Sequence, residues 1–123
     1  MKVIVPVLER AGLGSRLSDH FGRASHYAVI EVRPDGEVSV DFVDNPRTQG
    51  TKPGQYFAEL AVDLVAIKEG GGIGRRALEA LRQAGVEVVI INAATIEEAI
   101  EQLRKGSYRP YAGSGCPGKD GHH

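Results

Sequence analysis

Three stretches of the chain are hydrophobic at nearly every position: residues 3–7, 62–67 and 86–91. Short continuous runs of this kind are typical of strands that are buried on both faces, as in a parallel sheet. Between the last two runs, residues 73–84 place hydrophobic side chains on one face at helical spacing. A strand, a helix and a strand in this order predict a right-handed βαβ unit.

Two further strands are predicted between residues 27 and 43. Residues 27–32 are mostly hydrophobic, whereas residues 38–43 alternate hydrophobic and polar side chains, which leaves one face of that strand in water. Arg33-Pro34-Asp35-Gly36 joins them as a turn, because proline presets φ and glycine accepts a positive φ. We expect a hairpin at the edge of the sheet, with residues 3–7 at the centre of the sheet.

Two more helices complete the predicted elements. Thr95-Ile96-Glu97-Glu98 has the pattern of a capping box, so a helix is expected to begin there and to end at Gly106. Another is expected over residues 55–61, and Gly85 ends the helix over residues 73–84. The sequence thus predicts an α/β protein of two or three layers, with a mixed five-stranded sheet and about three helices.

The last part of the chain has a different character. Residues 107–123 are rich in glycine and proline and have no amphipathic period, so we expect a flexible tail there. Cys116 and His122 lie in this tail, and a thiolate with an imidazole is suited to coordinate iron, zinc or copper. The alternative is that the tail binds nothing and that the terminal His-His pair begins an engineered tag.

Composition excludes several functional classes. Of the 123 residues, 41% are hydrophobic and 25% are charged, as in an ordinary globular domain. A net charge of −1 and the absence of tryptophan argue against a nucleic-acid binder, and the charge argues equally against a membrane-surface protein. No hydrophobic run approaches the ~20 residues that span a bilayer, and no secretory signal precedes the first strand, so we expect a cytoplasmic protein.

The segment Asp19-His20-Phe21-Gly22-Arg23-Ala24 is the strongest candidate for chemistry. The His20 imidazole is suited to iron, the Arg23 guanidinium pairs with carboxylates, and Gly22 allows the main chain to approach a ligand closely. Each has a simpler interpretation: His20 as a loop residue bonded to nearby backbone, and Arg23 as half of a surface ion pair. Phe21 is interpreted either as a core residue that anchors the loop or as a wall of a ligand site.

A second candidate is Gly70-Gly71-Gly72-Ile73-Gly74, where a parallel strand leads into a helix. Glycines at this position expose successive backbone N–H groups, and the helix dipole adds positive charge, so an anion is well accommodated. We therefore assign Gly71, Gly72 and Gly74 to the candidate site. The alternative is that the glycines serve only a tight turn and close helix packing. If the two candidates form one pocket, His20 should lie near the backbone of Gly72 or Gly74.

These motifs together resemble the dinitrogenase iron–molybdenum cofactor biosynthesis family. The resemblance covers residues 1–106, and residues 107–123 lie outside it. The matching blocks, in chain order, are His20 to Ala24, residues 62–67 with 70–74 and Ala77-Leu78, and residues 94–100.

The resemblance implies a ribonuclease-H-like topology and a role connected with nitrogen fixation: binding and carrying an anionic iron–sulfur or iron–molybdenum type cofactor, or its precursor. This cofactor would be bound by His20, Phe21, Gly22 and Arg23 together with Gly71, Gly72 and Gly74, and His20 would contact metal. Cys116 and His122 lie outside the resemblance, so they are candidate metal ligands from their chemistry alone. The implied partner is a protein that donates or accepts the metallocluster, and the chain is expected to be a monomer or a homodimer.

One alternative function belongs to a different class: a regulatory or interaction domain that senses a small anion without any metal cluster. Enzymatic activity is not expected, because the acidic residues show no spacing suited to acid–base catalysis. The first strand also lacks the carboxylates that a ribonuclease-H-type metal site requires.

Overall fold

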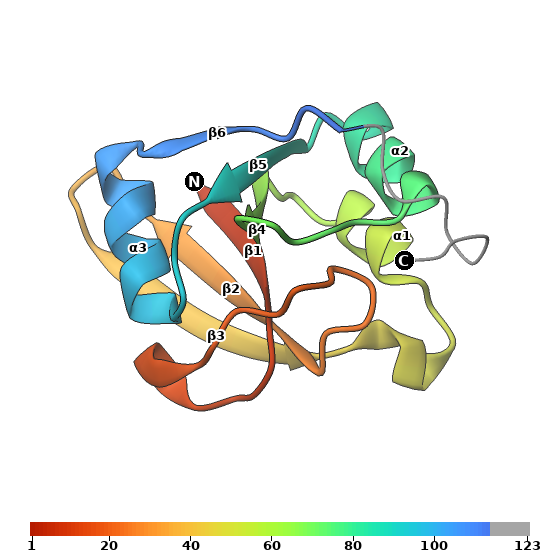
Figure 1. Cartoon of the computed structure of the whole chain (residues 1–123), viewed down its shortest axis with the longest axis horizontal. Helices are drawn as coiled ribbons and strands as arrows, with labels where there is room; N and C mark the ends of the chain where they lie inside the picture. Colours follow the sequence, from red (N-terminus) through yellow and green to blue (C-terminus); the bar gives the residue numbers. More distant parts are fainter. Residues whose placement is uncertain (114–123) are drawn as a thin grey trace.

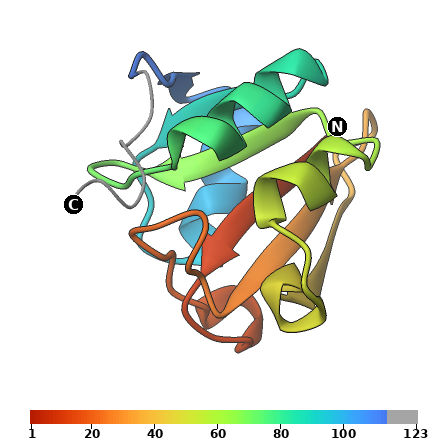
Figure 2. The same cartoon turned by 90° about the vertical axis from the view of Figure 1, so that its right-hand side faces the viewer.

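A six-stranded mixed sheet separates one helix from the other two in a computed structural model, which describes residues 1–113. Helix α3 covers one face of the sheet, and α1 and α2 cover the opposite face (Figures 1 and 2). In chain order the elements are β1 (Lys2–Val7), η1 (Gly12–Gly14), β2 (His26–Val32), β3 (Val38–Asp44), η2 (Pro46–Gln49), α1 (Pro53–Ala58), β4 (Leu64–Lys68), α2 (Arg75–Gln83), β5 (Glu87–Ile91), α3 (Ile96–Lys105) and β6 (Tyr108–Pro110). The α/β class and the helices are therefore confirmed, and the layers number three.

The strand order is β3-β2-β1-β4-β5-β6. Strands β1, β4 and β5 are parallel, whereas the β2–β3 hairpin and β6 are antiparallel to their neighbours. The central position of β1 and the edge position of β3 are as predicted. The carboxyl ends of the three parallel strands lie at one edge of the sheet, where ligands commonly bind in α/β proteins.

Alternate residues of β1 face two separate hydrophobic clusters, as the period of a strand requires. Val3, Val5 and Val7 pack on the side of α3, with Ile96, Ala99 and Leu103 of that helix. Ile4 faces the other side, where Phe57 of α1 and Leu78 and Leu81 of α2 complete the second cluster. Since both clusters are needed to cover β1, its unbroken hydrophobic run follows from the three-layer arrangement.

Local sequence signals place the helix ends. Thr95 caps α3, its hydroxyl accepting the N–H of Glu98 at 3.3 Å, while the Glu98 carboxylate accepts the N–H of Ala94 at 2.8 Å. Gly85 and Gly106 follow α2 and α3 with φ of 82° and 70°, a conformation that side chains disfavour. The first helix begins at Pro53 rather than at residue 55, because proline is well suited to the first helical position.

The prediction of five strands is wrong, because β6 adds a sixth within the segment expected to be a tail. Three residues are too few to show a period, so nothing local marks this strand. It forms because β5 is hydrophobic and its outer edge carries backbone groups that need partners. Beyond the strand, the Tyr111 N–H donates to the Val88 carbonyl at 2.8 Å, and Arg109 pairs with Glu69 at 2.9 Å.

Two further points concern the predicted tail and the membrane. Cys116 and His122 lie outside the described residues. Within residues 1–113, none of the helices has the length and hydrophobicity needed to span a bilayer.

Candidate functional site

The loop after β1 and the turn after β4 meet at the carboxyl edge of the sheet (Figure 1). His20 and Gly72 form an isolated parallel bridge. The Phe21 N–H donates to the Gly72 carbonyl at 3.0 Å, and the Gly72 N–H donates to the Asp19 carbonyl at 2.8 Å. The predicted proximity of His20 to the glycine-rich turn is confirmed, so the two candidate motifs form one surface.

The loop after β5 joins the same edge. The Leu17 N–H donates to the Ala94 carbonyl at 3.0 Å, and the Ile96 N–H donates to the Ser15 carbonyl at 2.9 Å. The segments that follow all three parallel strands are therefore linked by backbone hydrogen bonds. This network holds the β1 loop against the rest of the edge.

The glycines of the turn have different structural roles. A Cβ on Gly71 would lie 2.9 Å from Ile67 Cγ2 and 3.0 Å from the Asp19 carbonyl oxygen, so Gly71 permits close packing of the two segments. Among residues 1–113, no atom lies within 4 Å of a Cβ on Gly74, at the N-cap of α2. The packing interpretation therefore holds for Gly71 and not, within this part of the chain, for Gly74.

His20 is exposed at this edge. Its backbone is held by Ser18, whose hydroxyl accepts the His20 N–H at 3.2 Å and donates to the His20 carbonyl at 3.0 Å. Within residues 1–113, the imidazole has no hydrogen-bond or ion-pair partner. The backbone is thus fixed, while the ring nitrogens remain available to an external group.

Phe21 lies in the core and not on the surface. Its side chain is fully buried, and its ring packs edge-on against Tyr27 and Phe57, with centroids 5.4 and 6.1 Å away. The interpretation of Phe21 as the anchor of the loop is confirmed. Its assignment as a cofactor-binding residue is corrected, because a ring at 0% exposure cannot line an open site.

Two polar side chains beneath the loop hold its backbone. The buried Tyr27 hydroxyl donates to the Phe21 carbonyl, and burial raises the pKa of this phenol well above its usual value, although Arg47 opposes the shift. The Asn45 amide donates to the carbonyls of Ala24 at 2.7 Å and Gly22 at 3.2 Å. Carbonyl groups that turn inward are thereby satisfied without water.

Arg47 completes the support of the loop from the outside. Its Nε donates to the Gly22 carbonyl at 2.8 Å, and the side chain is exposed. Sequence analysis missed Tyr27, Asn45 and Arg47, because nothing local relates them to residues 20–24. The local signal that could have marked this support is the Asn45-Pro46 pair, because Asn-Pro favours the start of a turn.

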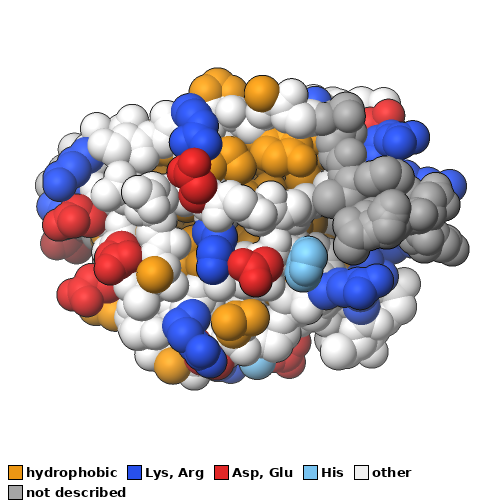
Figure 3. All heavy atoms as spheres, in the orientation of Figure 1, with side chains coloured by type: hydrophobic (Ala, Val, Ile, Leu, Met, Phe, Trp, Pro, Cys, Tyr) orange, Lys and Arg blue, Asp and Glu red, His pale blue; other side chains and the backbone are white. Residues whose placement is uncertain are grey.

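Positive charge surrounds this surface. Within residues 1–113, Arg23, Arg47, Arg75 and Arg76 have no carboxylate partner within 4 Å, whereas Lys68 pairs with Asp19 at 3.0 Å. Arg23 is therefore not half of a surface ion pair there. In the space-filling view, a histidine on the face that Figure 1 presents lies between an Asp or Glu side chain and Lys or Arg side chains (Figure 3). A chain of net charge −1 thus has four arginines without a carboxylate partner among the described residues, on segments that form or adjoin the His20 surface.

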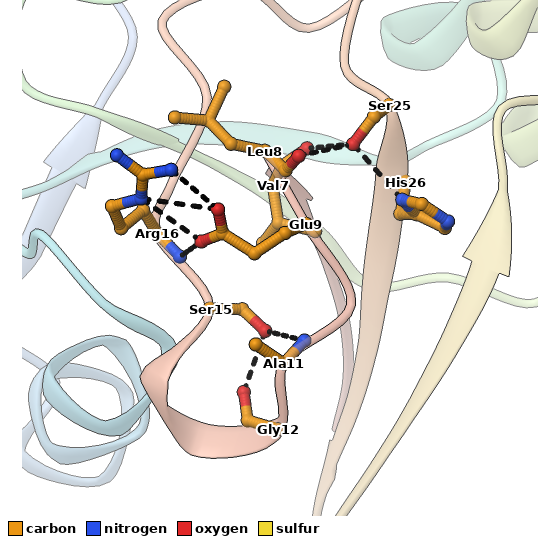
Figure 4. Close-up of polar contacts among 9 residues, drawn as sticks. All are labelled: Val7, Leu8, Glu9, Ala11, Gly12, Ser15, Arg16, Ser25 and His26. Atoms are coloured by element: carbon orange, nitrogen blue, oxygen red, sulfur yellow. Dashed lines mark hydrogen bonds and ion pairs between the residues drawn. The ribbon is translucent and has the colours of Figure 1, made fainter.

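The base of the β1 loop is fixed by a separate set of polar contacts (Figure 4). Glu9 and Arg16 pair at 2.7 Å, which lowers the pKa of the Glu9 carboxyl. The Ser25 hydroxyl donates to the Leu8 carbonyl at 2.6 Å and lies 3.0 Å from His26 Nδ1. His26 is half-buried, with its Nε2 3.3 Å from an Asp44 carboxylate oxygen, so its ring links the start of β2 to the end of β3.

The described residues contain no preassembled metal site. Among residues 1–113, no three His, Cys, Asp or Glu side chains gather in a group suited to a metal ion. A shallow surface depression lies elsewhere, along α3, between Leu13 and Lys105. The expected exposure of successive N–H groups is wrong for Gly71 and Gly72, which donate to the Lys68 and Asp19 carbonyls at 2.8 Å each. The chemistry available at the His20 surface is therefore one imidazole and several guanidinium groups, a set suited to an anion that carries its own metal.

Comparisons with known proteins found a matching family and similar folds. The model of a family described as dinitrogenase iron-molybdenum cofactor matches residues 1–106. An uncharacterized protein of Methanocaldococcus jannaschii is 25% identical over 117 residues, covering 90% of this chain and 92% of that protein. The crystal structure of the protein PH0822 is similar with a TM-score of 0.73 and 26% identity, over 91% of this chain and 97% of the other.

Two further solved structures are similar. A putative NifB protein from Thermotoga has a TM-score of 0.66 and 26% identity, over 89% of this chain and 91% of that chain. The apo form of the orange protein from Desulfovibrio gigas has a TM-score of 0.73 over 91% and 93% of the two chains. At 23% identity, this last likeness concerns the fold alone.

Proposed function

Because the chain belongs to the dinitrogenase iron-molybdenum cofactor family, we propose that it binds and carries an anionic iron–sulfur or iron–molybdenum type cluster, or a precursor of one. The cluster is cargo, and the protein acts as a carrier or chaperone in metallocluster biosynthesis. No bond in the cargo needs to be made or broken by the protein, so the proposal includes no enzymatic activity.

The His20–Gly72 bridge is the observation that carries this proposal. It brings an exposed imidazole, whose ring has no partner within residues 1–113, next to a glycine-rich turn at the start of a helix. Arginines without carboxylate partners flank the same surface. An anionic cluster needs all three features: a ligand atom, close backbone approach and compensating charge.

Each residue has a distinct role in the proposed mechanism. The His20 imidazole supplies one nitrogen ligand to iron, and the Arg23 guanidinium pairs with the anionic surface of the cargo or with a carboxylate that the cargo carries. The backbone of Gly72 and Gly74 lies where the N-terminus of α2 adds partial positive charge. Since one nitrogen and several electrostatic contacts are weaker than a closed ligand set, the cargo can be released to an acceptor.

The remaining ligands must come from elsewhere. One thiolate cannot complete a four-cysteine cluster site, so Cys116 and His122 would at most add to His20. We propose that a metallocluster donor or acceptor protein in the cytoplasm supplies or receives the cargo, with the chain as a monomer or homodimer. The ribonuclease-H-like topology is proposed as well, supported by the order β3-β2-β1-β4-β5 with an antiparallel hairpin.

A second candidate is a domain that senses a small anion without a metal cluster. It is favoured by the unneutralised arginines and by the absence of a three-ligand group within residues 1–113. In that case the His20 ring would be incidental. Phosphate or citrate would bind to the same surface through the arginines and the N-terminus of α2.

An anaerobic titration separates the two candidates. The probe is a synthetic anionic [4Fe–4S] cluster with exchangeable thiolate ligands, followed by visible absorption, with citrate as the metal-free probe. We expect the cluster to bind, His20→Ala to weaken it about tenfold and Arg104→Ala, on α3, to have no effect. If wild type binds citrate but no cluster, and His20→Ala still binds citrate, the result would support the anion-sensing domain. Loss of cluster binding in Cys116→Ala alone would move the site to the C-terminal segment.

A further inference from the structure

The backbone of Arg47 is held in place by hydrogen bonds that do not involve its own side chain. It lies in η2, where the Asn45 side chain accepts the Arg47 N–H at 2.9 Å. Gly50 follows the helix with φ of 81° and donates its N–H to the Arg47 carbonyl at 3.0 Å. The start of the Arg47 side chain is therefore directed by a capped turn with little freedom.

The guanidinium lies against a glycine that leaves room for it. Arg47 Nε donates to the Gly22 carbonyl at 2.8 Å, and a Cβ on Gly22 would lie 3.2 Å from Arg47 Nη2. A side chain at residue 22 would require the guanidinium to shift by a few tenths of an ångström. The contact therefore favours glycine at this position, where φ imposes no such requirement.

The same contact places charge on the candidate site. Gly22 lies between His20 and Arg23, and the adjacent Phe21 N–H is bonded to the Gly72 carbonyl. Among the described residues, no carboxylate lies within 4 Å of the Arg47 guanidinium, which is exposed. Its position is fixed by a neutral carbonyl, so its positive charge remains uncompensated.

We propose that Arg47 is a positioning residue of the cargo site. It holds the Gly22 carbonyl so that the His20 loop stays against Gly72, and it presents a second guanidinium, besides Arg23, to an anionic cargo. This inference rests on the proposed function for the nature of the cargo. The positioning of the loop does not depend on any cargo, so the two parts are measured separately.

The test uses the full chain with three substitutions: Arg47→Gln, Arg47→Lys and the control Arg104→Gln on α3. Arg47→Gln removes charge and the Nε donor, whereas Arg47→Lys keeps the charge and loses the planar fork. Amide exchange at Phe21 and Gly72 reports the loop without cargo, and titration with the synthetic anionic [4Fe–4S] cluster at two salt concentrations reports binding.

We expect Arg47→Gln to accelerate exchange at Phe21 and to weaken cluster binding, each about tenfold, and to reduce the salt dependence of binding. Arg47→Lys should restore binding and its salt dependence more fully than it restores exchange. The inference is overturned if amide exchange at Phe21 in Arg47→Gln is as slow as in wild type. It is also overturned if Arg104→Gln accelerates this exchange as much as Arg47→Gln does. If wild type binds no cluster, the proposed function fails, while faster exchange in Arg47→Gln still supports the positioning role.

Discussion

His20 and Gly72 lie opposite each other in a parallel bridge that joins the loop after β1 to the turn after β4. The bridge uses only backbone groups, through hydrogen bonds of 3.0 and 2.8 Å, so the imidazole is left out of it. A residue can thus be fixed by its main chain while its side chain stays exposed. This relationship places the candidate ligand at the carboxyl edge of the sheet without using the ring to hold the fold.

The turn glycines provide a matched pair of substitutions. Gly71→Ala should lower the free energy of unfolding by about 1–3 kcal/mol, because its Cβ would lie 2.9 Å from Ile67 Cγ2 and from the Lys68 carbonyl oxygen. Gly74→Ala should cost less than about 1 kcal/mol, since no atom of the described residues lies within 4 Å of its Cβ and its φ is −66°. Urea unfolding of both variants measures the difference, and equal losses would contradict the packing role of Gly71.

Gly74→Ala also probes the site. If the cargo approaches the backbone at the start of α2, a methyl group there should weaken cluster binding several-fold in a protein that still folds. Cluster titration of Gly74→Ala beside wild type checks this expectation. If Gly74→Ala binds the cluster as tightly as wild type does, Gly74 does not contact the cargo, and Gly72 remains the candidate contact in this turn.

Tyr27 should make the protein sensitive to alkaline pH. Burial raises the pKa of the folded phenol above the value of about 10 that it has in the unfolded chain. The stabilisation is therefore fully present below pH of about 10 and is lost as pH rises toward the folded pKa, because the unfolded chain ionises first. The free energy of unfolding should fall by up to about 1.4 kcal/mol per pH unit in that window.

Tyr27→Phe separates this effect from the titration of lysines and other tyrosines. The variant loses the hydroxyl that donates to the Phe21 carbonyl, so at neutral pH it should be about 1–3 kcal/mol less stable than wild type. Its stability should fall less steeply above pH 10 than that of wild type. If the free energy of unfolding falls equally steeply with pH in both proteins, Tyr27 is not the source of the sensitivity to alkaline pH.

Strand β6 should contribute measurably to stability although it has only three residues. Truncation after Ser107 removes its pairing with β5, the Tyr111–Val88 hydrogen bond and the bond from Arg82 to the Tyr111 carbonyl. We expect Tm to fall by roughly 5 °C or more. Truncation after Gly113 keeps β6 and should change Tm little, because residues 114–123 lack a hydrophobic period. Thermal unfolding of both truncations is the measurement.

Amide exchange should distinguish the centre of the sheet from its edge. Strands β1, β4 and β5 are nearly continuously buried, whereas β3 has exposed or half-buried residues throughout. Exchange in β1, β4 and β5 should therefore require global unfolding, while β3 opens locally and exchanges faster. Slower exchange in β3 than in β1 would contradict the assigned strand order.

Much of the candidate site could be predicted from the local sequence. His20 and Gly72 both follow strands predicted to be parallel and buried, and loops at the carboxyl ends of such strands converge. Their proximity could be expected before any coordinates. The supporting contacts of Asn45 and Arg47 could not be expected from the sequence. They join residues more than 20 positions apart, and the pattern of hydrophobic and polar positions carries no signal of them.

The sequence by itself determined which segments become strands β1 to β5 and the three α-helices, but not strand β6. Hydrophobic period, the Thr95 cap and glycines at positive φ act over a few residues, so they can be recognised along the chain. Only the tertiary structure decided that Phe21 is buried, that β6 pairs with β5 and that Arg47 lies over Gly22. Those outcomes depend on which surfaces remain to be covered, and which backbone groups still need partners, once the sheet has formed.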